Sequence, residues 1–253
     1  MKIDIVVPVS GGKDSQACLK LAIEKHGSDK VLGLFCDTQF EHPLTYQHVD
    51  KMKELYGVNI ERICLGSVPD VVRRYKRFPG GGARHCTKEL KIIPSKRWYV
   101  DFAKKNGGFD VWYGMRGGES NARMKRYSDK VSMERYPPND VLADYPKSLH
   151  KNGVCFVLPI LDWSESNVFD FLDGHENPLY RMGEKRVGCF PCLAGGDASK
   201  EHSFNMDEFG RQQREVVRVL EGELGRSIWT SKGGWLRNEA PQLDFGGCSF
   251  CSM

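Results

Sequence analysis

The segment Ser10–Ser15 combines residue types that bind phosphate. Its sequence, Ser-Gly-Gly-Lys-Asp-Ser, lies between an apolar run and a helical pattern. Two glycines let the backbone approach a ligand closely, and the first amides of a helix, two hydroxyls and an ammonium group can bind an anion. The spacing differs from the Walker A motif and from Gly-x-Gly-x-x-Gly. A plain turn would explain the glycines but not the Lys-Asp-Ser after them. We therefore predict a phosphate site with Lys13 and Asp14 as candidate catalytic residues.

Two Cys-x-x-Cys units form the second chemical signal. They are Cys189–Cys192 and Cys248–Cys251, each in a glycine-rich turn. One interpretation is a zinc ribbon built from both pairs, with Cys86 left as a reactive thiol. Another is a four-iron four-sulfur cluster bound by Cys86, Cys189, Cys192 and either Cys248 or Cys251. A third is an uncoordinated redox set, and Cys248 or Cys251 is also a candidate mobile catalytic thiol.

Alternating strand and helix patterns surround these residues. Strands are predicted at 3–9, 31–36, 60–65, 109–114 and 155–160, with helices after the turn and around 44–56, 69–77 and 94–105. Apolar strands that alternate with helices indicate a parallel sheet covered on both faces, where ligands bind at the carboxyl ends of strands. We predict an α/β fold with a doubly wound, mainly parallel sheet and a small cysteine-bearing C-terminal extension.

The alternation of predicted strands and helices ends near residue 186. Glycine-rich turns and one predicted helix at 207–224 replace the earlier alternation. Fewer than about 70 residues make a marginal core alone. The expected organisation is therefore a nucleotide-binding α/β domain over residues 1–185 and a cysteine-rich extension over 186–253 packed on it.

Composition and charge narrow the function classes. The chain has 253 residues with 40% hydrophobic and 28% charged content, as in ordinary globular proteins. Its apolar runs are too short to span a membrane, and Asp4 interrupts any signal-peptide core, so we expect a cytoplasmic protein with no membrane partner. Residues 71–97 carry nine lysines and arginines against one acid, which predicts anion contacts from Arg84, Lys88 and Lys91. A solvated face is the alternative for such a run.

The phosphate turn matches the PP-loop of the ATP pyrophosphatase superfamily, which holds the β,γ-pyrophosphate of ATP. Further segments resemble the phosphoadenosine phosphosulfate (PAPS) reductase family over roughly residues 3–192; they are 36–43, 84–94, 114–120 with Arg123, and 159–163. The resemblance implies an adenine nucleotide α-hydrolase-like fold, with ATP and Mg²⁺ as ligands. The implied nucleotide-binding residues are Ser10, Gly11, Gly12, Lys13, Asp14, Ser15, Asp37, Gly114, Arg116, Glu119 and Arg123. Arg116 and Arg123 can act as anion forks, and Glu119 would orient one of them.

The resemblance also favours the iron–sulfur cluster over zinc. Iron–sulfur members of the family carry a Cys-Cys pair before a basic helix and a later Cys-x-x-Cys. Cys86, Cys189 and Cys192 match three of these positions, whereas His85 stands where the first cysteine of the pair would be. A fourth ligand would then come from Cys248 or Cys251.

Two enzymatic functions are compatible with these motifs. The first is a sulfur transferase that adenylylates an acceptor, DNA or tRNA, as in phosphorothioation and thiolation proteins, with a cysteine desulfurase or a reductant such as thioredoxin as partner. The second is reduction of PAPS or adenosine phosphosulfate to sulfite through a thiosulfonate on a tail cysteine. Reductase turns resemble Ser-Phe-Ser-x-Gly, so the intact Ser10–Ser15 turn favours the first. A redox-sensing nucleotide-binding module is a third, non-enzymatic alternative.

Overall fold

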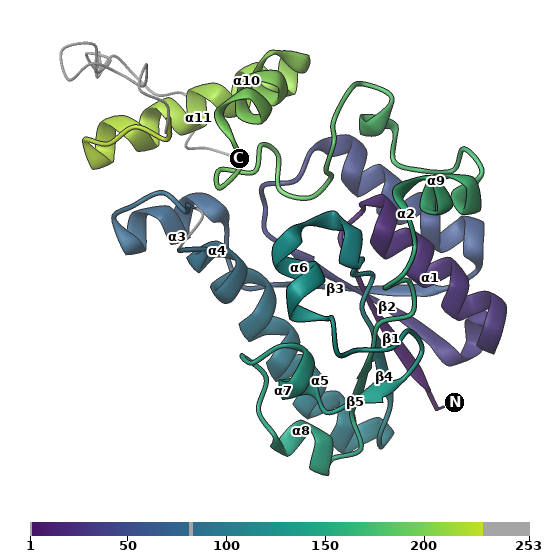
Figure 1. Ribbon diagram of the computed structural model, residues 1–253. Coiled ribbons are helices and arrows are strands. Elements are labelled where there is room, and N and C mark those ends of the chain that lie inside the picture. Colours follow the sequence, from purple (N-terminus) through teal and green to yellow (C-terminus); the bar gives the residue numbers. More distant parts are fainter. Residues whose placement is uncertain (1, 81–82, 230–253) are drawn as a thin grey trace.

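The computed structural model describes residues 2–80 and 83–229 (Figure 1), so Cys248 and Cys251 lie outside the described residues. Six strands in this part of the chain form one sheet in the order β3-β2-β1-β4-β6-β5. They are β1 Ile5–Val9, β2 Val31–Asp37, β3 Asn59–Cys64, β4 Asp110–Trp112, β5 Arg135–Tyr136 and β6 Cys155–Val157. All neighbouring pairs are parallel except β5 with β6, which confirms the predicted α/β class.

Helices cover both faces of the sheet. The longer ones are α1 Lys13–His26, α2 Pro43–Tyr56, α3 Val68–Tyr75, α5 Ile93–Asn106, α9 Glu165–Leu172, α10 Asp197–Met206 and α11 Glu208–Leu224. The shorter ones are α4 His85–Thr87, α6 Asn121–Arg126, α7 Pro138–Val141 and α8 Ser148–Lys151, and a π-helical turn, Lys88–Ile92, joins α4 to α5. In Figure 1, α1, α2 and α9 lie on one side of the sheet, and α5, α7 and α8 lie on the other.

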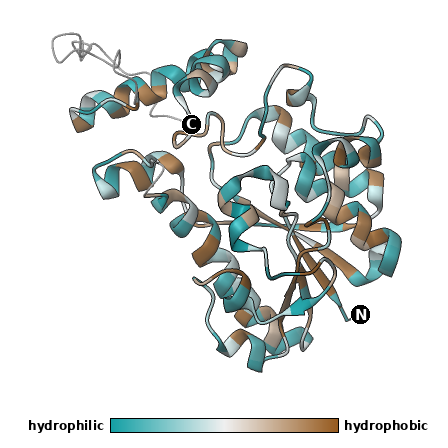
Figure 2. Cartoon of the chain, viewed as in Figure 1, coloured by the Kyte–Doolittle hydropathy of each residue, from teal (hydrophilic) through white to brown (hydrophobic). Residues whose placement is uncertain are grey.

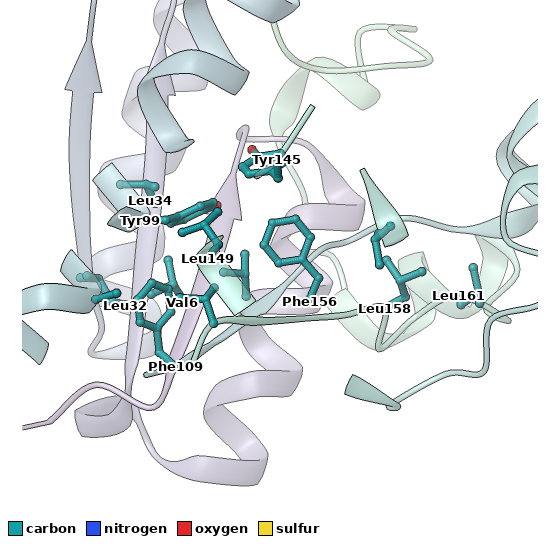
Figure 3. Close-up of a cluster of buried hydrophobic side chains, with 14 of the residues drawn as sticks. Val6, Leu32, Leu34, Tyr99, Phe109, Tyr145, Leu149, Phe156, Leu158 and Leu161 are labelled. Atoms are coloured by element: carbon teal, nitrogen blue, oxygen red, sulfur yellow. The ribbon is translucent and has the colours of Figure 1, made fainter. Parts of the chain in front are cut away.

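Alternation along the strands explains this double cover. Successive side chains of a strand point to opposite faces. On β1, Val7 packs with residues of α1 and α2, whereas Val6 packs with Tyr99 of α5 and Phe156 of β6. Figure 3 shows this second cluster, and Figure 2 shows the strands as hydrophobic segments at the centre of the molecule. Burying each aromatic side chain contributes about 1.5–3 kcal/mol, so both faces of the sheet are anchored.

A separate hydrophobic cluster joins the C-terminal helices to the rest. Val72 of α3 and Leu90 of the π-helical turn pack with Phe204 of α10 and Leu220 of α11. A polar link adds to this contact: the Nδ1 atom of His42 accepts the amide of Leu44 at the start of α2, and its Nε2 atom donates to Asp207, the residue that caps α11, at 2.8 Å. Residues after 186 are therefore in contact with the sheet-bearing part at more than one point.

Several elements differ from the sequence prediction. The predicted strands 109–114 and 155–160 shrink to Asp110–Trp112 and Cys155–Val157, while β5 and α10 were not predicted. The first shortening has a visible cause: a Cβ at Gly114 would lie 2.5 Å from the carbonyl oxygen of Asp14, so the chain leaves the sheet to pack against α1. In the described ranges no helix is both long and apolar enough to cross a membrane.

Candidate functional site: a phosphate turn beside a group of thiols

The turn between β1 and α1 lies where the strand order reverses. The chain adds β2 and β3 on one side of β1 and β4 on the other, which is the usual ligand position in such sheets. Gly11 has φ +75°, and a Cβ there would lie 2.5 Å from the side chain of Thr45. The Oγ atom of Ser15 accepts the amide of Ser10 and donates to the carbonyl of Gly12 at 2.8 Å. These bonds hold the turn in a fixed, open shape.

Lys13 is the first residue of α1 and only 3% exposed. Its Nζ atom lies 3.0 Å from the carboxylate of Glu165 and 4.9 Å from the centre of the Tyr180 ring. Its backbone amide donates to the hydroxyl of Tyr180 at 2.9 Å. The ammonium group is thus held at the helix start, where both it and the helix dipole favour an anion.

Asp14, which is partly exposed, and the buried Arg116 form an ion pair beside the turn. The Nε atom of Arg116 donates to Asp14 at 2.6 Å, and Arg116 is 5% exposed. The segment after β4 carries Arg116 back onto α1, an approach that Gly114 permits. A short charge-assisted bond of this kind fixes the guanidinium group in place.

A cavity of about 730 Å³ opens over these residues, and we call it the turn cavity. Six cationic side chains line it against three carboxylates, so it attracts anions. Of the residues predicted to bind nucleotide, those that line it are Ser10, Gly12, Lys13, Asp14, Ser15, Gly114, Arg116, Glu119 and Arg123. The structure therefore brings together nine side chains or backbone positions from two distant segments.

Glu119 organises one wall of the turn cavity. Its carboxylate pairs with Arg123 of α6 and with Arg186, the latter at 3.0 Å. It does not orient Arg116, which pairs with Asp14 instead. Both Arg123 and Arg186 remain at the cavity wall and can offer further donors to an anion.

Asp37 lies at the end of β2, away from this cavity. Its carboxylate accepts bonds from Arg62 Nε at 2.9 Å, the Tyr46 hydroxyl at 2.8 Å and the Gln39 amide at 2.8 Å. Burial pushes the pKa of Asp37 upward, but the bonds from Arg62, Gln39 and Tyr46 outweigh it, so the pKa lies below its ordinary value. The carboxylate is occupied by protein donors, and its predicted role toward nucleotide or Mg²⁺ stays a prediction.

A second, smaller space adjoins the turn cavity. This aromatic cavity of about 230 Å³ is lined by Phe35, Tyr99, Tyr113 and Tyr145 among others, and it shares Tyr113 and Lys91 with the turn cavity. The hydroxyls of Tyr113 and Tyr145 lie 2.9 Å apart. A polar cavity and a flat apolar one side by side suit a ligand with phosphates and an aromatic ring.

The thiol region consists of Cys86, Cys189 and Cys192. Cys86 interacts electrostatically with Cys192, and Cys189 also interacts with Cys192. Burial raises the pKa of Cys86, and it raises that of Cys189 to about 11 although the nearby Lys91 lowers it. Without a metal, the Cys189 thiol is therefore protonated at neutral pH. Within residues 2–80 and 83–229, no three His, Cys, Asp or Glu side chains are arranged to hold a metal ion.

Lys91 connects the thiol region with both cavities. It lines the turn cavity and the aromatic cavity. In the alkaline range where Lys91 titrates, the Cys189 thiolate, followed by Glu41, Cys36 and Cys192, raises the pKa of Lys91. The other two basic candidates line neither of these two cavities: Arg84 is exposed just before α4, and Lys88 is exposed at the start of the π-helical turn. Of the predicted basic contacts, the structure brings only Lys91 to the site.

A segment of which sequence reasoning identified only Cys189 and Cys192 spans the whole site. We call residues 177–193 the bridging segment. Asn177 donates to the carbonyl of Gly11 at 3.1 Å, Tyr180 accepts the amide of Lys13, and the amide of Phe190 donates to Phe40 after β2 at 2.6 Å. In the sequence, the one further sign of this segment is Asn177 before a proline, which is typical of a helix N-cap. That pattern does not indicate a contact with the phosphate turn.

Comparisons with known proteins identify several similar chains. An uncharacterized protein of Methanocaldococcus jannaschii is 27% identical over 252 residues, which cover 93% of this chain and only 46% of that protein. A phosphoadenosine 5'-phosphosulfate reductase of Photorhabdus laumondii is 25% identical over 193 residues, or 73% of this chain and 68% of the reductase. A solved U34-tRNA thiolase of Methanococcus maripaludis with its 4Fe-4S cluster has a TM-score of 0.48 and 19% identity, covering 91% of this chain and 75% of the thiolase.

The model of the phosphoadenosine phosphosulfate reductase domain matches residues 4–194. This range contains every strand of the sheet, the phosphate turn and all three members of the thiol region. Since the match extends over most of the sequence and the fold is the predicted one, the chain belongs to the phosphoadenosine phosphosulfate reductase domain family.

Proposed function

We propose that the protein is an ATP-dependent sulfur transferase that releases AMP and pyrophosphate and whose acceptor is a nucleic acid, DNA or tRNA. The observation that carries the proposal is the complete phosphate turn, with Lys13 and the Asp14–Arg116 pair, opening onto a cationic cavity next to the thiol region. A nucleotide-binding module without catalysis would not need this full set of groups.

The two cavities suit the two ends of ATP. The triphosphate would lie in the turn cavity, where Lys13, Arg123 and Arg186 surround it with positive charge. The adenine ring would lie in the aromatic cavity, between side chains such as Phe35 and Tyr113. Bridging both, Lys91 would lie near the α-phosphate, which is the reacting centre.

The reaction proceeds in two displacements. An oxygen of the acceptor attacks the α-phosphorus of ATP, and the bond from this phosphorus to pyrophosphate breaks with its electron pair going to pyrophosphate. Lys13 would stabilise the charge that develops on this leaving group. A hydrosulfide-level nucleophile then attacks the acceptor atom that carries the adenylylated oxygen, and AMP leaves. Sulfur replaces oxygen with no net oxidation or reduction.

The thiol region is the proposed place of the sulfur chemistry. Two segments distant in the sequence contribute three thiols, Cys86 from one and Cys189 and Cys192 from the other, and soft thiolates suit iron–sulfur clusters. Cys86, Cys189 and Cys192 would hold the cluster with Cys248 or Cys251, and a cluster supplies a site where a further sulfur atom can bind. A cysteine desulfurase or thioredoxin would act as partner. Zinc in the same ligands remains the alternative outcome of a metal analysis.

Metal content tests this part directly. Anaerobically purified protein should contain iron and show the visible absorption typical of iron–sulfur clusters. Replacing Cys189 with serine should remove most of this iron. Cys64→Ser serves as the matched control because Cys64 is exposed at the end of β3, outside the thiol region. Stoichiometric zinc without iron would contradict the cluster.

Sulfonucleotide reduction is the second candidate function. It is favoured by the similarity to a PAPS reductase. In that reaction a tail thiolate, Cys248 or Cys251, would attack the sulfur of PAPS, release adenosine bisphosphate and leave a thiosulfonate for reduction to sulfite. Both cysteines lie outside the described residues.

Nucleotide preference separates the two functions. Calorimetry should show that ATP with Mg²⁺ binds at least about tenfold more tightly than PAPS or adenosine phosphosulfate, a difference of about 1.4 kcal/mol. With bulk tRNA or DNA and sulfide present, ATP should yield AMP and pyrophosphate. Tighter binding of PAPS together with sulfite formation would overturn the proposal in favour of the reductase.

A further inference from the structure

Tyr180 touches two parts of the site that are far apart in sequence. Its hydroxyl accepts the backbone amide of Lys13 at 2.9 Å, and the backbone of Val187 lies close enough to influence the pKa of this hydroxyl as a donor. Val187 precedes Cys189 by two residues. A single hydroxyl therefore lies between the first amide of α1 and the chain that enters the thiol region.

The packing around Gly12 supports this connection independently. A Cβ on Gly12 would come within 3.0 Å of the carbonyl oxygen of Val187 and 3.2 Å of the Tyr180 hydroxyl. The bridging segment thus lies directly on the phosphate turn, and any larger residue at position 12 would push it away. The ring of Tyr180 also faces the Nζ atom of Lys13 at 4.9 Å.

The far end of the bridging segment is fixed to the loop after β2. The amide of Phe190 donates to Phe40 at 2.6 Å, Cys189 pairs with Glu41 in an isolated antiparallel bridge, and the Cys189 Sγ atom lies 3.2 Å from the Thr38 hydroxyl. Between this anchor and Tyr180, Lys185 and Arg186 line the turn cavity. A polyphosphate there would meet cations on both sides, Lys13 from the turn and Lys185 and Arg186 from the bridging segment.

We propose that Tyr180 is a positioning residue whose hydroxyl couples occupancy of the phosphate turn to the placement of Cys189 and Cys192. Phosphates that bind Lys13 together with Lys185 and Arg186 hold the bridging segment more firmly against the turn, and the Tyr180 hydroxyl transmits this restraint to Val187 and the thiols beyond it. The inference rests on the proposed function only in requiring a polyphosphate at the turn.

Amide hydrogen exchange of residues 184–193 tests the coupling, and it works whether or not the thiols hold metal. The probes are ATP with Mg²⁺, PAPS and inorganic pyrophosphate. In the unaltered protein the probe that binds should slow exchange in this segment by about fivefold or more. In Tyr180→Phe, which keeps the ring and removes only the hydroxyl, the slowing should fall below about 1.5-fold while the probe still binds.

The control is Tyr56→Phe. The Tyr56 hydroxyl also bonds a residue of α1, Gln16, at 3.1 Å, but it touches neither Lys13 nor Val187. This variant should keep the full slowing. If Tyr180 has a purely structural role, Tyr180→Phe should raise the exchange rate of this segment equally with and without probe. The probe would then slow exchange by the same factor as in the unaltered protein, and that result would overturn the proposal.

Calorimetry on the same samples distinguishes a failure of the sulfur-transferase proposal from a failure of the Tyr180 coupling. If PAPS or pyrophosphate binds and slows exchange but ATP does not bind, the sulfur-transferase proposal fails and the coupling stands. If ATP binds without slowing exchange in the unaltered protein, the coupling fails and the sulfur-transferase proposal stands. If no probe changes exchange, the coupling is wrong.

Discussion

The phosphate turn and the thiol region lie beside each other, yet they are built differently. Around the turn, charged groups already have opposite partners: Lys13 with Glu165 at 3.0 Å and Arg116 with Asp14 at 2.6 Å. In the thiol region, burial raises the pKa of Cys86 and Cys189, and no metal-holding group forms among the described residues. Ion pairs and hydrogen bonds of the protein itself hold the turn, whereas the thiol region would be completed only by the proposed cluster.

This difference reflects where each region comes from in the sequence. The turn needs one strand, one helix start and a neighbouring arginine, all held by the sheet. The thiol region combines Cys86 on α4 with Cys189 and Cys192 on the bridging segment, and the proposed fourth ligand, Cys248 or Cys251, would come from beyond the described residues. A site assembled from more separate segments is more sensitive to the loss of any one contact. The following predictions test this contrast.

Replacing Lys13 with alanine should have the largest effect. Loss of the ammonium group at the helix start should lower pyrophosphate release from ATP about 1,000-fold, or ~4 kcal/mol. The protein should still fold, because its partner Glu165 has a side chain that is 61% exposed and can be hydrated. Lys25→Ala, at the exposed end of α1, should release pyrophosphate at the normal rate. Unchanged release in Lys13→Ala would contradict the assignment of the turn.

Breaking the Asp14–Arg116 pair should cost stability as well as activity. In Asp14→Ala the guanidinium group of Arg116 becomes a buried, unpaired charge, and the free energy of unfolding should fall by about 3 kcal/mol. Lys53→Ala removes the exposed ion pair with Asp50 and should change the free energy of unfolding by less than about 0.5 kcal/mol. Denaturant titration measures both. Equal losses would show that the turn is not rigidly preorganised.

Lowering the pH should lower the free energy of unfolding through His48, which packs against α1. The Nε2 atom of His48 bonds Gln16 of α1 at 2.9 Å, and burial lowers the pKa of His48 to about 4. Between pH 6.5 and pH 4 the unfolded chain binds a proton at this residue and the folded chain does not, so stability falls as the pH falls. The unaltered protein should lose about 2 kcal/mol more than His48→Gln over this range. Parallel titration curves for the two proteins would refute this.

Removing one hydroxyl near the thiols should have the smallest effect. The Thr38 Oγ1 atom donates to Glu41 at 2.7 Å and lies beside Cys189, so Thr38→Val should lower the free energy of unfolding by about 1 kcal/mol. Thr45→Val is the matched control, because the Thr45 hydroxyl is buried without a partner among the described residues. That variant should be neutral or stabilised. A loss in Thr45→Val as large as in Thr38→Val would mean that the bond to Glu41 contributes nothing specific.

Much of the fold was predictable because apolar strands and glycine turns are local signals. The strands β1 to β3 and the helix after the turn lie close to their predicted bounds. β5 could not be predicted, since its two residues form a strand only by pairing with β6. Likewise α10 follows Gly196 in a stretch whose sequence is typical of turns, and packing of Phe204 with Val72, Leu90 and Leu220 stabilises the helix there.

The candidate site was predictable only in part, for a related reason. Residues within one motif, such as Ser10–Ser15, were found from spacing alone, and Arg116 came from a resemblance. Asp37 was placed correctly at a strand end, but its partners Arg62 and Tyr46 come from other elements and occupy it. Tyr180 was missed because only the fold brings it to Lys13, 167 residues away in the chain.

The bond between His42 and Asp207 has a consequence for folding. His42 caps the start of α2, Asp207 caps the start of α11, and the two side chains bond each other. The two helices should therefore gain and lose order together. A chain shortened to residue 194, where the family match ends, would keep every strand but leave the Nε2–H of His42 unpaired and uncover Val72 and Leu90. We expect such a chain to fold less cooperatively, because the cooperative unit extends beyond the segment shared with the family.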